Sequence, residues 1–404
     1  MMCAWRVFST TLALCLAACG SSNSSSPPSE VVTSSTINQP TVINLYPHES
    51  AGGTDPLITV MVSSVGNVPV SMPLGFDTGS SGVTLYAQSI FPASMVNDSG
   101  FVFPAGETSL SYNGITVTNV QGTRTYGNES TLVETGNLGF ATVTFGDSAG
   151  QITTQVMPVF FFYSLSYTSA DIGSGYFPPM WQGWFGVAGT RQPINVAGSV
   201  APAGGFGGCT QQTTTTCLMV SPLKFIDYGN QVNAGFSLSP SPTLPICDIS
   251  TSGSCAPQPL LTVGLNSQTE SGFNTTPMTC PPEGYTGPAD IAGYPVCDKG
   301  IDNTTVTASG ASTGSYMNSA IFDTGTPDMH FSTPTGSSFP AIVLPGTTIT
   351  ITTPSGFDFS YTAGTGTTNT VVAPGGGGNT IIGVEYFMAH SFMIDFTSSI
   401  EGWK

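Results

Sequence analysis

The chain has 404 residues and a formal net charge of -17, with six lysines and arginines against 23 acidic residues. This charge argues against nucleic acid as a partner, because a phosphate backbone repels an acidic surface. Charged residues make up only 7% of the sequence, whereas glycine occurs 49 times and proline 31 times. Alternating apolar and polar runs recur between these turn-forming residues. We therefore expect an all-β protein, long enough for two domains, with few and short helices.

The N-terminus carries the pattern of an export signal. Arg6 precedes an apolar run at residues 7–18, which is too short to cross a bilayer as a helix but has the length of a signal peptide. The run ends in Leu16-Ala17-Ala18-Cys19-Gly20, which resembles the lipobox of bacterial lipoproteins. That resemblance implies a signal peptide at residues 1–19, a lipid anchor on Cys19, and a place in the bacterial outer membrane, facing the periplasm or the cell surface. An ordinary signal peptide with a chance cysteine is the alternative.

The rest of the chain divides by composition into a tether and two β lobes. Residues 20–53 are polar and rich in serine and proline, which predicts a flexible tether. Strand and turn patterns follow, until a Pro-rich connection begins around residues 235–242 and a second run of strands begins near residues 260–264. We therefore predict an N-terminal β lobe at residues 54–242 and a C-terminal β lobe at residues 243–404.

Each predicted lobe contains nearly the same five residues after an apolar run. The first copy is Phe76-Asp77-Thr78-Gly79-Ser80 and the second is Phe322-Asp323-Thr324-Gly325-Thr326. Farther along, each copy is followed by an apolar-apolar-Gly segment, at residues 183–187 and 380–384. A single copy would most simply be a structural Asx turn. Two copies in matched settings predict instead a pair of carboxylates, one from each lobe, that share a proton.

Such a pair has a specific chemistry. We expect one of Asp77 and Asp323 to act as a base toward a trapped water and the other as an acid toward a substrate carbonyl oxygen. The other motif residues are expected to bond across the lobe interface, to let backbone amides approach the carboxylates, and to donate hydroxyl hydrogen bonds to them. These three tasks fall to Thr78 and Thr324, to Gly79 and Gly325, and to Ser80 and Thr326.

The order of motifs resembles that of pepsin-like aspartic peptidases over about residues 57–403. The resemblance implies that Thr125-Tyr126-Gly127-Asn128 belongs to the family's flap hairpin, with Tyr126 as the flap tyrosine that helps to bind substrate. Further matching segments are residues 136–139, 183–189, 381–383 and 392–396. The resemblance also implies a bilobed double-psi β-barrel architecture with a catalytic cleft between the lobes. The activity that it implies is that of a monomeric aspartic endopeptidase that acts on peptides or proteins without a metal or other cofactor.

Two departures from the family pattern leave a second hypothesis open. Gly82-Val83-Thr84-Leu85-Tyr86 follows the first motif without the tryptophan that usually supports the flap tyrosine, and Pro327 follows the second motif. The alternative is therefore a catalytically weak or inactive surface lipoprotein of the same fold, with a binding or structural role.

Six cysteines follow Cys19, and an even number in an exported chain predicts disulfides. A zinc site is the alternative, but neither a C-x-x-C motif nor a nearby histidine pair supports it. Their grouping favours bonds between neighbours: Cys209 with Cys217, Cys247 with Cys255, and Cys280 with Cys297.

One further motif suggests a serine protease. Gly146-Asp147-Ser148-Ala149-Gly150 nearly matches the G-D-S-G-G sequence, and His48 and Asp77 lie upstream. Because the stretch joins two apolar runs, it predicts a hairpin turn and not a strand-to-helix elbow that would expose a nucleophile.

Overall fold

The computed structural model describes most of the chain from residue 34 onward. The described residues are 34–49, 56–126, 132–167, 182–189, 191–196, 216–247, 255–281, 290–298, 300–364, 370–375 and 378–404. The elements are β1 (Thr36–Ile37), β2 (Thr41–Glu49), β3 (Pro56–Val65), β4 (Val68–Asp77), β5 (Ser81–Tyr86), η1 (Ala87–Ser89), β6 (Val96–Asn97), β7 (Gly100–Phe101), β8 (Ser109–Tyr112), β9 (Ile115–Tyr126), β10 (Leu132–Ala141), β11 (Val143–Asp147), β12 (Gly150–Thr153), β13 (Met157–Tyr167), β14 (Trp184–Val187), β15 (Arg191–Val196), β16 (Thr216–Val220), η3 (Pro222–Phe225), β17 (Asp227–Tyr228), β18 (Asn233–Leu238), β19 (Gln258–Leu265), β20 (Asn274–Pro277), β21 (Asp290–Ile291), β22 (Tyr294–Pro295), β23 (Ile301–Gly310), β24 (Gly314–Phe322), β25 (Met329–Thr333), β26 (Thr347–Thr352), β27 (Asp358–Thr362), β28 (Thr370–Pro374), β29 (Thr380–Ile382), α1 (Val384–Ala389), β30 (Phe392–Asp395) and β31 (Ile400–Trp403). The prediction of an all-β chain with few and short helices is confirmed.

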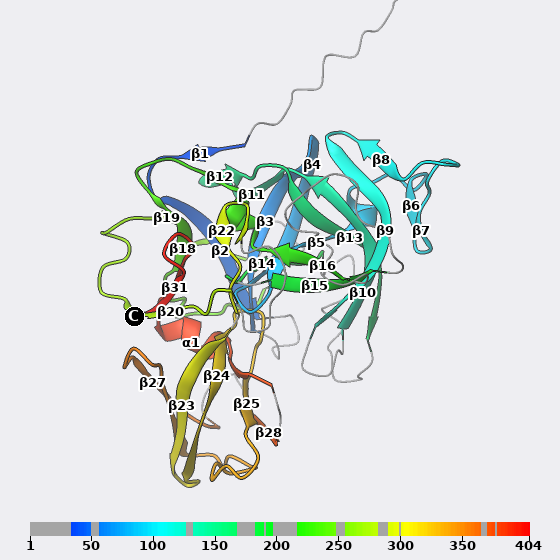
Figure 1. The fold of residues 1–404 in the computed structure, drawn as a ribbon. Helices are drawn as coiled ribbons and strands as arrows, with labels where there is room; N and C mark the ends of the chain where they lie inside the picture. The colour runs from blue at the N-terminus through cyan, green and yellow to red at the C-terminus, as the bar shows by residue number, and fades with distance from the viewer. Residues whose placement is uncertain are drawn as a thin grey trace, which may run out of the picture. The chain divides into compact units, whose positions relative to one another are not determined.

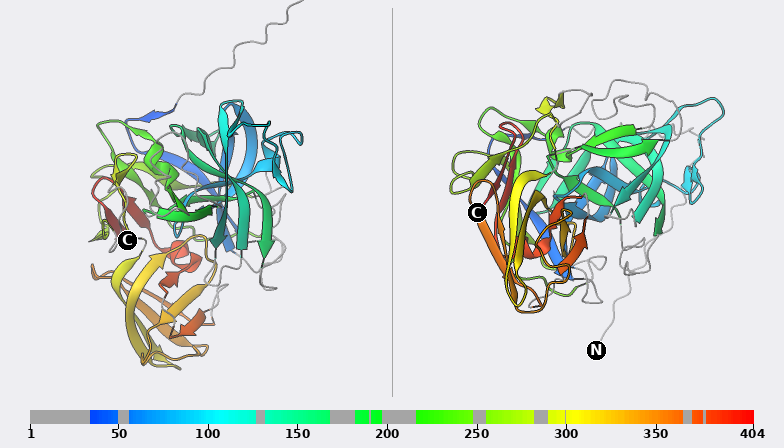
Figure 2. Two further views of the ribbon diagram at one scale, coloured as in Figure 1. Left: turned by 45° about the vertical axis from the view of Figure 1, so that its right-hand side comes forward. Right: turned by 60° about the horizontal axis from the view of Figure 1, so that its bottom comes forward.

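Two sheet systems contain most of these strands (Figure 1). A large closed barrel takes in β2 to β5, β8 to β16, β18 to β20, β30 and β31. A seven-stranded sheet has the order β27-β26-β23-β24-β29-β25-β28, and its strands are coloured from yellow to orange in Figure 2. Each system carries one copy of the repeated motif, at the end of β4 and just after β24.

The prediction of a tether is wrong for the last part of residues 20–53. Strand β2 pairs with β3 on one side and with β19 on the other. Its Ile43 and Leu45 are fully buried, so apolar side chains on one face hold the strand against the core. In the sequence, the polar residues between them made this segment look like a tether. Residues 20–33 lie outside the described part of the chain.

Strand pairing also crosses the predicted lobe boundary. The N-terminal strand β2 pairs with β19, and β18 pairs with β30 near the C-terminus. The two halves of the sequence therefore share one hydrogen-bonded sheet system.

The repeated motif occurs in the same strand arrangement twice. In the first copy, β14 runs parallel to β4 and antiparallel to β5, with Gly186 opposite Asp77. In the second copy, β29 runs parallel to β24 and antiparallel to β25, with Ile382 opposite Phe322. Each apolar-apolar-Gly segment thus lies between the strand that leads into the motif and the strand that leaves it. Because these short strands contact a partner on both sides, they hold the intervening Asp loop in place.

Aromatic packing anchors the residue that precedes each motif aspartate. The Phe76 ring lies 6.3 Å from that of Phe185 and 6.2 Å from that of Phe236. The Phe322 ring lies 4.8 Å from that of Tyr386 and 5.3 Å from that of Trp403. Buried aromatic pairs of this kind restrict the backbone of the adjoining turn.

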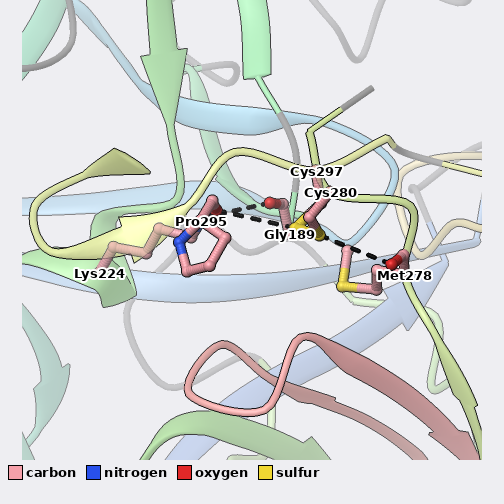
Figure 3. The surroundings of a disulfide bond; sticks show 6 residues. All are labelled: Gly189, Lys224, Met278, Cys280, Pro295 and Cys297. Atoms are coloured by element: carbon pink, nitrogen blue, oxygen red, sulfur yellow. Dashed lines mark hydrogen bonds between the residues drawn. A yellow bond between two sulfur atoms is a disulfide. The ribbon is translucent and has the colours of Figure 1, made fainter. Parts of the chain in front are cut away.

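Two of the predicted disulfides are present, Cys247–Cys255 and Cys280–Cys297. Near the second, the buried Lys224 donates hydrogen bonds to the carbonyl oxygens of Gly189 at 3.2 Å and Pro295 at 2.8 Å (Figure 3). The predicted partner Cys209 lies outside the described residues, so the pairing of Cys209 with Cys217 stays a prediction.

The signal peptide and Cys19 lie outside the described residues too. Among the helices of the described part, none is long and apolar enough to span a membrane.

Candidate active site

Four hydrogen bonds join the two D-T-G loops through their threonines. The Thr78 hydroxyl donates to the Phe322 carbonyl oxygen at 2.7 Å, and the Thr324 hydroxyl donates to the Phe76 carbonyl oxygen at 2.5 Å. Each hydroxyl also accepts from the backbone N–H of the other threonine, at 3.1 and 3.0 Å. Both threonines are buried, so removing either would leave several buried polar groups without partners. The expected bonds across the interface are present.

Each aspartate receives the same kinds of donor from its own loop. Asp77 Oδ1 accepts from the backbone N–H groups of Gly79 and Ser80, both at 2.8 Å, and Oδ2 accepts from the Ser80 hydroxyl at 2.5 Å. Asp323 Oδ1 accepts from the Gly325 N–H at 2.7 Å, and Oδ2 accepts from the Thr326 hydroxyl at 2.6 Å. These bonds fix both carboxylate planes.

The two glycines show how closely the loops approach one another. A methyl group on Gly79 would lie 2.3 Å from Cγ of Asp323, and one on Gly325 would lie 2.8 Å from Cγ of Asp77. Both positions exclude a side chain, because each loop lies directly against the carboxyl group of the other. The same methyl group on Gly325 would lie 3.1 Å from Oδ1 of Asp77 and 3.1 Å from Oδ1 of Asp323, so the two carboxyl groups lie close together.

This environment raises the affinity of the pair for a proton. Asp77 is only 4% exposed. Burial, and next the charge of Asp323, raise the pKa of Asp77 well above its ordinary value, while the Ser80 hydrogen bond and the positive charge of Arg124 act in the opposite direction. The surroundings of Asp77 therefore favour a pair that keeps one proton.

Tyr126 lies at the end of β9, on the hairpin that β9 forms with β10. Its ring lies 5.3 Å from that of Trp184, and the Arg124 guanidinium lies 4.7 Å from its centre. Burial raises the pKa of Tyr126 well above its ordinary value. A tryptophan from β14 therefore packs against Tyr126, although none follows the first motif directly. The turn that contains Gly127 and Asn128 lies outside the described residues, so the flap role of Tyr126 stays a prediction.

Two buried ionisable side chains behind the first loop are not recognised from the sequence. Arg124 and Glu134 face each other across β9 and β10, and neither side chain is exposed. Arg124 Nη2 donates to the Ser81 carbonyl oxygen at 3.0 Å and to the Ser80 hydroxyl at 3.3 Å. Burial raises the pKa of Glu134 to about 7 against the influence of Arg124. The chain has only six basic residues, so an arginine within an alternating strand pattern was the sequence signal that could have indicated a buried, functional position.

The motif that suggests a serine protease forms a hairpin, as predicted. Strands β11 and β12 pair antiparallel with Asp147 opposite Gly150. The Asp147 carboxylate accepts hydrogen bonds from the Asn44 amide, the Tyr46 hydroxyl and the Ala149 N–H. These bonds give Asp147 a structural role, and Ser148 is exposed at the turn.

Two solved structures share the fold of this chain at low sequence identity. An aspartic proteinase from Irpex lacteus is 17% identical, with a TM-score of 0.51, and the match covers 90% of this chain and 96% of that one. Basic 7S globulin from soybean is 11% identical, with a TM-score of 0.50 and coverage of 91% and 96%. No protein-family model matches the chain, and no curated protein matches its sequence. The predicted pepsin-like all-β fold is confirmed, whereas identities this low do not by themselves transfer an activity.

Proposed function

We propose that the protein is an aspartic endopeptidase in which Asp77 and Asp323 hydrolyse peptide bonds through a shared proton. The observation that carries the proposal is the pair of carboxyl groups, whose loops are joined by the hydrogen bonds that Thr78 and Thr324 make to each other and to the opposite loop. Each carboxyl group is also held by an amide and a hydroxyl donor from its own loop. Two carboxyl groups that lie close together cannot both ionise freely, so a singly ionised pair is the stable form over a wide pH range.

The singly ionised pair can perform the reaction without a cofactor. The carboxylate takes a proton from a water molecule while the water oxygen attacks the carbonyl carbon of the peptide. The protonated carboxyl group gives its proton to the carbonyl oxygen. The carboxyl group that took a proton from the water then gives it to the nitrogen of the tetrahedral intermediate. As the C–N bond breaks, a hydroxyl group of the intermediate returns its proton to the other carboxylate. The products are an amine and a carboxylic acid, and the pair again holds one proton.

The alternative of an inactive binding or structural protein has less support. The likeness to a soybean protein named as a globulin is consistent with it. However, both aspartates, both threonines and both hydroxyl donors are present and arranged alike in the two loops. A protein without turnover would not require this matched set of donors.

Digestion of a peptide library over a range of pH tests the activity. We expect cleavage that a pepstatin-type inhibitor blocks and a serine-hydrolase inhibitor leaves unchanged. Absence of cleavage at every pH would favour the binding protein, and inhibition by the serine reagent would contradict the carboxyl mechanism.

We also propose that the chain is a lipoprotein of the bacterial outer membrane, anchored through Cys19. The lipobox-like sequence and the serine-rich segment after it support this proposal. Cys19→Ala should move the protein out of the membrane fraction or block its processing. Cys15→Ala, a change of the same kind within the apolar run, is the matched control and should leave fractionation unchanged.

A further inference from the structure

The two aspartates differ in what lies behind their hydroxyl donors. The Ser80 hydroxyl, which donates to Asp77 at 2.5 Å, accepts a hydrogen bond from Arg124 Nη2 at 3.3 Å. The structure describes two other basic side chains, and both are engaged elsewhere. Lys224 binds the carbonyl oxygens of Gly189 and Pro295, and Lys404 binds that of Ser271. Among the three, Arg124 alone joins the hydrogen-bond network of the carboxyl pair, and it does so only at Asp77.

Arg124 is placed so that its charge is weakly screened. The side chain is fully buried, and its guanidinium lies against the ring of Tyr126, which packs against an apolar cluster that includes Leu138, Phe162 and Trp184. Its Nε and Nη1 groups have no hydrogen-bond partner among the described residues. In such surroundings a charge acts on neighbouring ionisable groups more strongly than it would in water.

The charge of Arg124 lowers the pKa of three titratable groups, which lie on different strands. Asp77 ends β4, Tyr126 ends β9 and Glu134 lies on β10. Glu134 is the strand partner of Arg124, and its carboxylate accepts hydrogen bonds from the hydroxyl groups of Thr84 at 3.0 Å and Tyr126 at 3.5 Å. When Glu134 is protonated, Arg124 carries an uncompensated positive charge behind Asp77. When Glu134 is ionised, its negative charge opposes that of Arg124.

We propose that Arg124 is a positioning residue of the carboxyl pair: it holds Ser80 against Asp77 and favours ionisation of Asp77, with Glu134 as the group that moderates its charge. Arg124 does not touch the reacting atoms. Its task is to offset the cost of ionising a deeply buried aspartate, so that the singly ionised pair forms at lower pH. The proposal deepens the proposed peptidase function, and its kinetic consequences rest on that function, but its effect on Asp77 does not.

The pH profile distinguishes this role from a merely structural one. Loss of the positive charge in Arg124→Gln should make each proton of the pair harder to remove, so both limbs of the kcat/KM profile should move upward, by about one pH unit. Arg124→Lys keeps the charge and should restore both limbs to near their wild-type positions. A residue needed only for packing would lower activity without moving either limb.

Glu134→Gln supplies a test in the opposite direction. The neutral amide leaves Arg124 uncompensated above the pKa of Glu134, so the pair should lose its last proton more easily. The alkaline limb should then move to lower pH, whereas the change in Arg124→Gln is upward. If both arginine variants fail to fold, the direction of this shift decides: a downward shift supports the proposal, and an unmoved or raised limb overturns it.

A readout without turnover separates this proposal from the peptidase proposal. Titration of 13C-labelled aspartate carboxyl groups in the full-length protein, with Asp77→Asn to assign the signal, reports Asp77 directly. If the wild type cleaves no peptide but Arg124→Gln raises the measured pKa of Asp77, the peptidase proposal fails and the role of Arg124 stands. If the protein cleaves peptides and neither the titration nor the limbs move in Arg124→Gln, the role of Arg124 is wrong.

Discussion

The two D-T-G loops have matching hydrogen bonds but different surroundings. Each aspartate accepts from a backbone amide and a hydroxyl of its own loop. The first loop is buried from Phe76 to Thr78 and again from Ser80, with Arg124 and Glu134 behind it. The second loop is partly exposed at Asp323 and at residues 325–328.

This difference shows that the geometry of a carboxylate and its proton affinity have separate causes, which the repeated sequence does not distinguish. The local hydrogen bonds set the geometry of each carboxylate, so a repeated motif produces a repeated geometry. The proton affinity depends on burial and nearby charge, which come from elements outside the motif. A symmetric sequence can therefore hold an asymmetric pair of acids.

The largest effect is expected where the loops are most alike. Asp77→Asn and Asp323→Asn should each lower kcat about 1,000-fold or more, because neither leaves a pair that can share a proton. Circular dichroism and thermal unfolding should show a folded protein, since asparagine keeps the shape of the side chain. Asp302→Asn is the matched control, because Asp302 is exposed on β23. A variant with asparagine in either loop that cleaves peptides like the wild type would contradict the shared mechanism.

Substitution of the two motif glycines should lower activity to a different extent in each loop. A methyl group at residue 79 meets Asp323 Cγ at 2.3 Å, whereas one at residue 325 meets Asp77 Cγ at 2.8 Å. We expect both alanine variants to displace a carboxyl group and to lower kcat by about 100-fold, with Gly79→Ala the more severe. Gly378→Ala, where the methyl group would meet Ser332 Oγ at an ordinary 3.5 Å, should behave as the wild type. Equal activity of all three variants would show that the loops are less closely packed than described.

Tyr126 belongs only to the surroundings of the first loop, so its loss should cost less. Tyr126→Ala removes the ring that packs on Trp184 and Arg124, and we expect kcat/KM to fall by about 10-fold to 100-fold. Tyr126→Phe keeps the ring and is the control, with activity close to that of the wild type. A loss as large as that of the aspartate variants would assign Tyr126 a part in proton transfer.

The smallest effect is the pH dependence of stability. Burial raises the pKa of Glu134 to about 7 and that of Glu401 to about 8. An acid with a raised folded pKa stabilises the fold fully below its unfolded pKa, and this contribution is lost as pH rises through the folded value. Chemical denaturation should therefore show lower stability at pH 7 than at pH 4.5. Lys224, whose pKa burial lowers to about 7, acts in the opposite direction but only above that pH.

Replacement of these acids by the neutral amide tests this explanation. Glu134→Gln and Glu401→Gln should each reduce the difference between pH 4.5 and pH 7 by about 1 to 3 kcal/mol. Because Glu134 lies beside the first loop and Glu401 on β31, only the former should also alter the pH profile of activity. An unchanged difference in both variants would exclude these carboxyl groups as the cause.

The sequence alone determined those features that depend on local pattern. Alternation of apolar and polar residues predicted the all-β fold, and the short spacings of Cys247 with Cys255 and Cys280 with Cys297 predicted two disulfides that are present. The repeated D-T-G motif predicted that Asp77 would lie close to a second carboxyl group. Each of these signals lies within a few residues of the chain, or is written in it twice.

Only the tertiary structure decided which residues far apart in the sequence contact one another. Strand β2 looks like part of a tether until its pairing with β19 buries Ile43 and Leu45. Trp184 supports Tyr126 because β14 passes beside the β9 hairpin, and Arg124 reaches Ser80 for the same kind of reason. These contacts join residues that strand pairing and packing bring together, and no periodicity within one segment records them. The proton affinity of the carboxyl pair depends on such contacts, since burial and charge are properties of the folded neighbourhood.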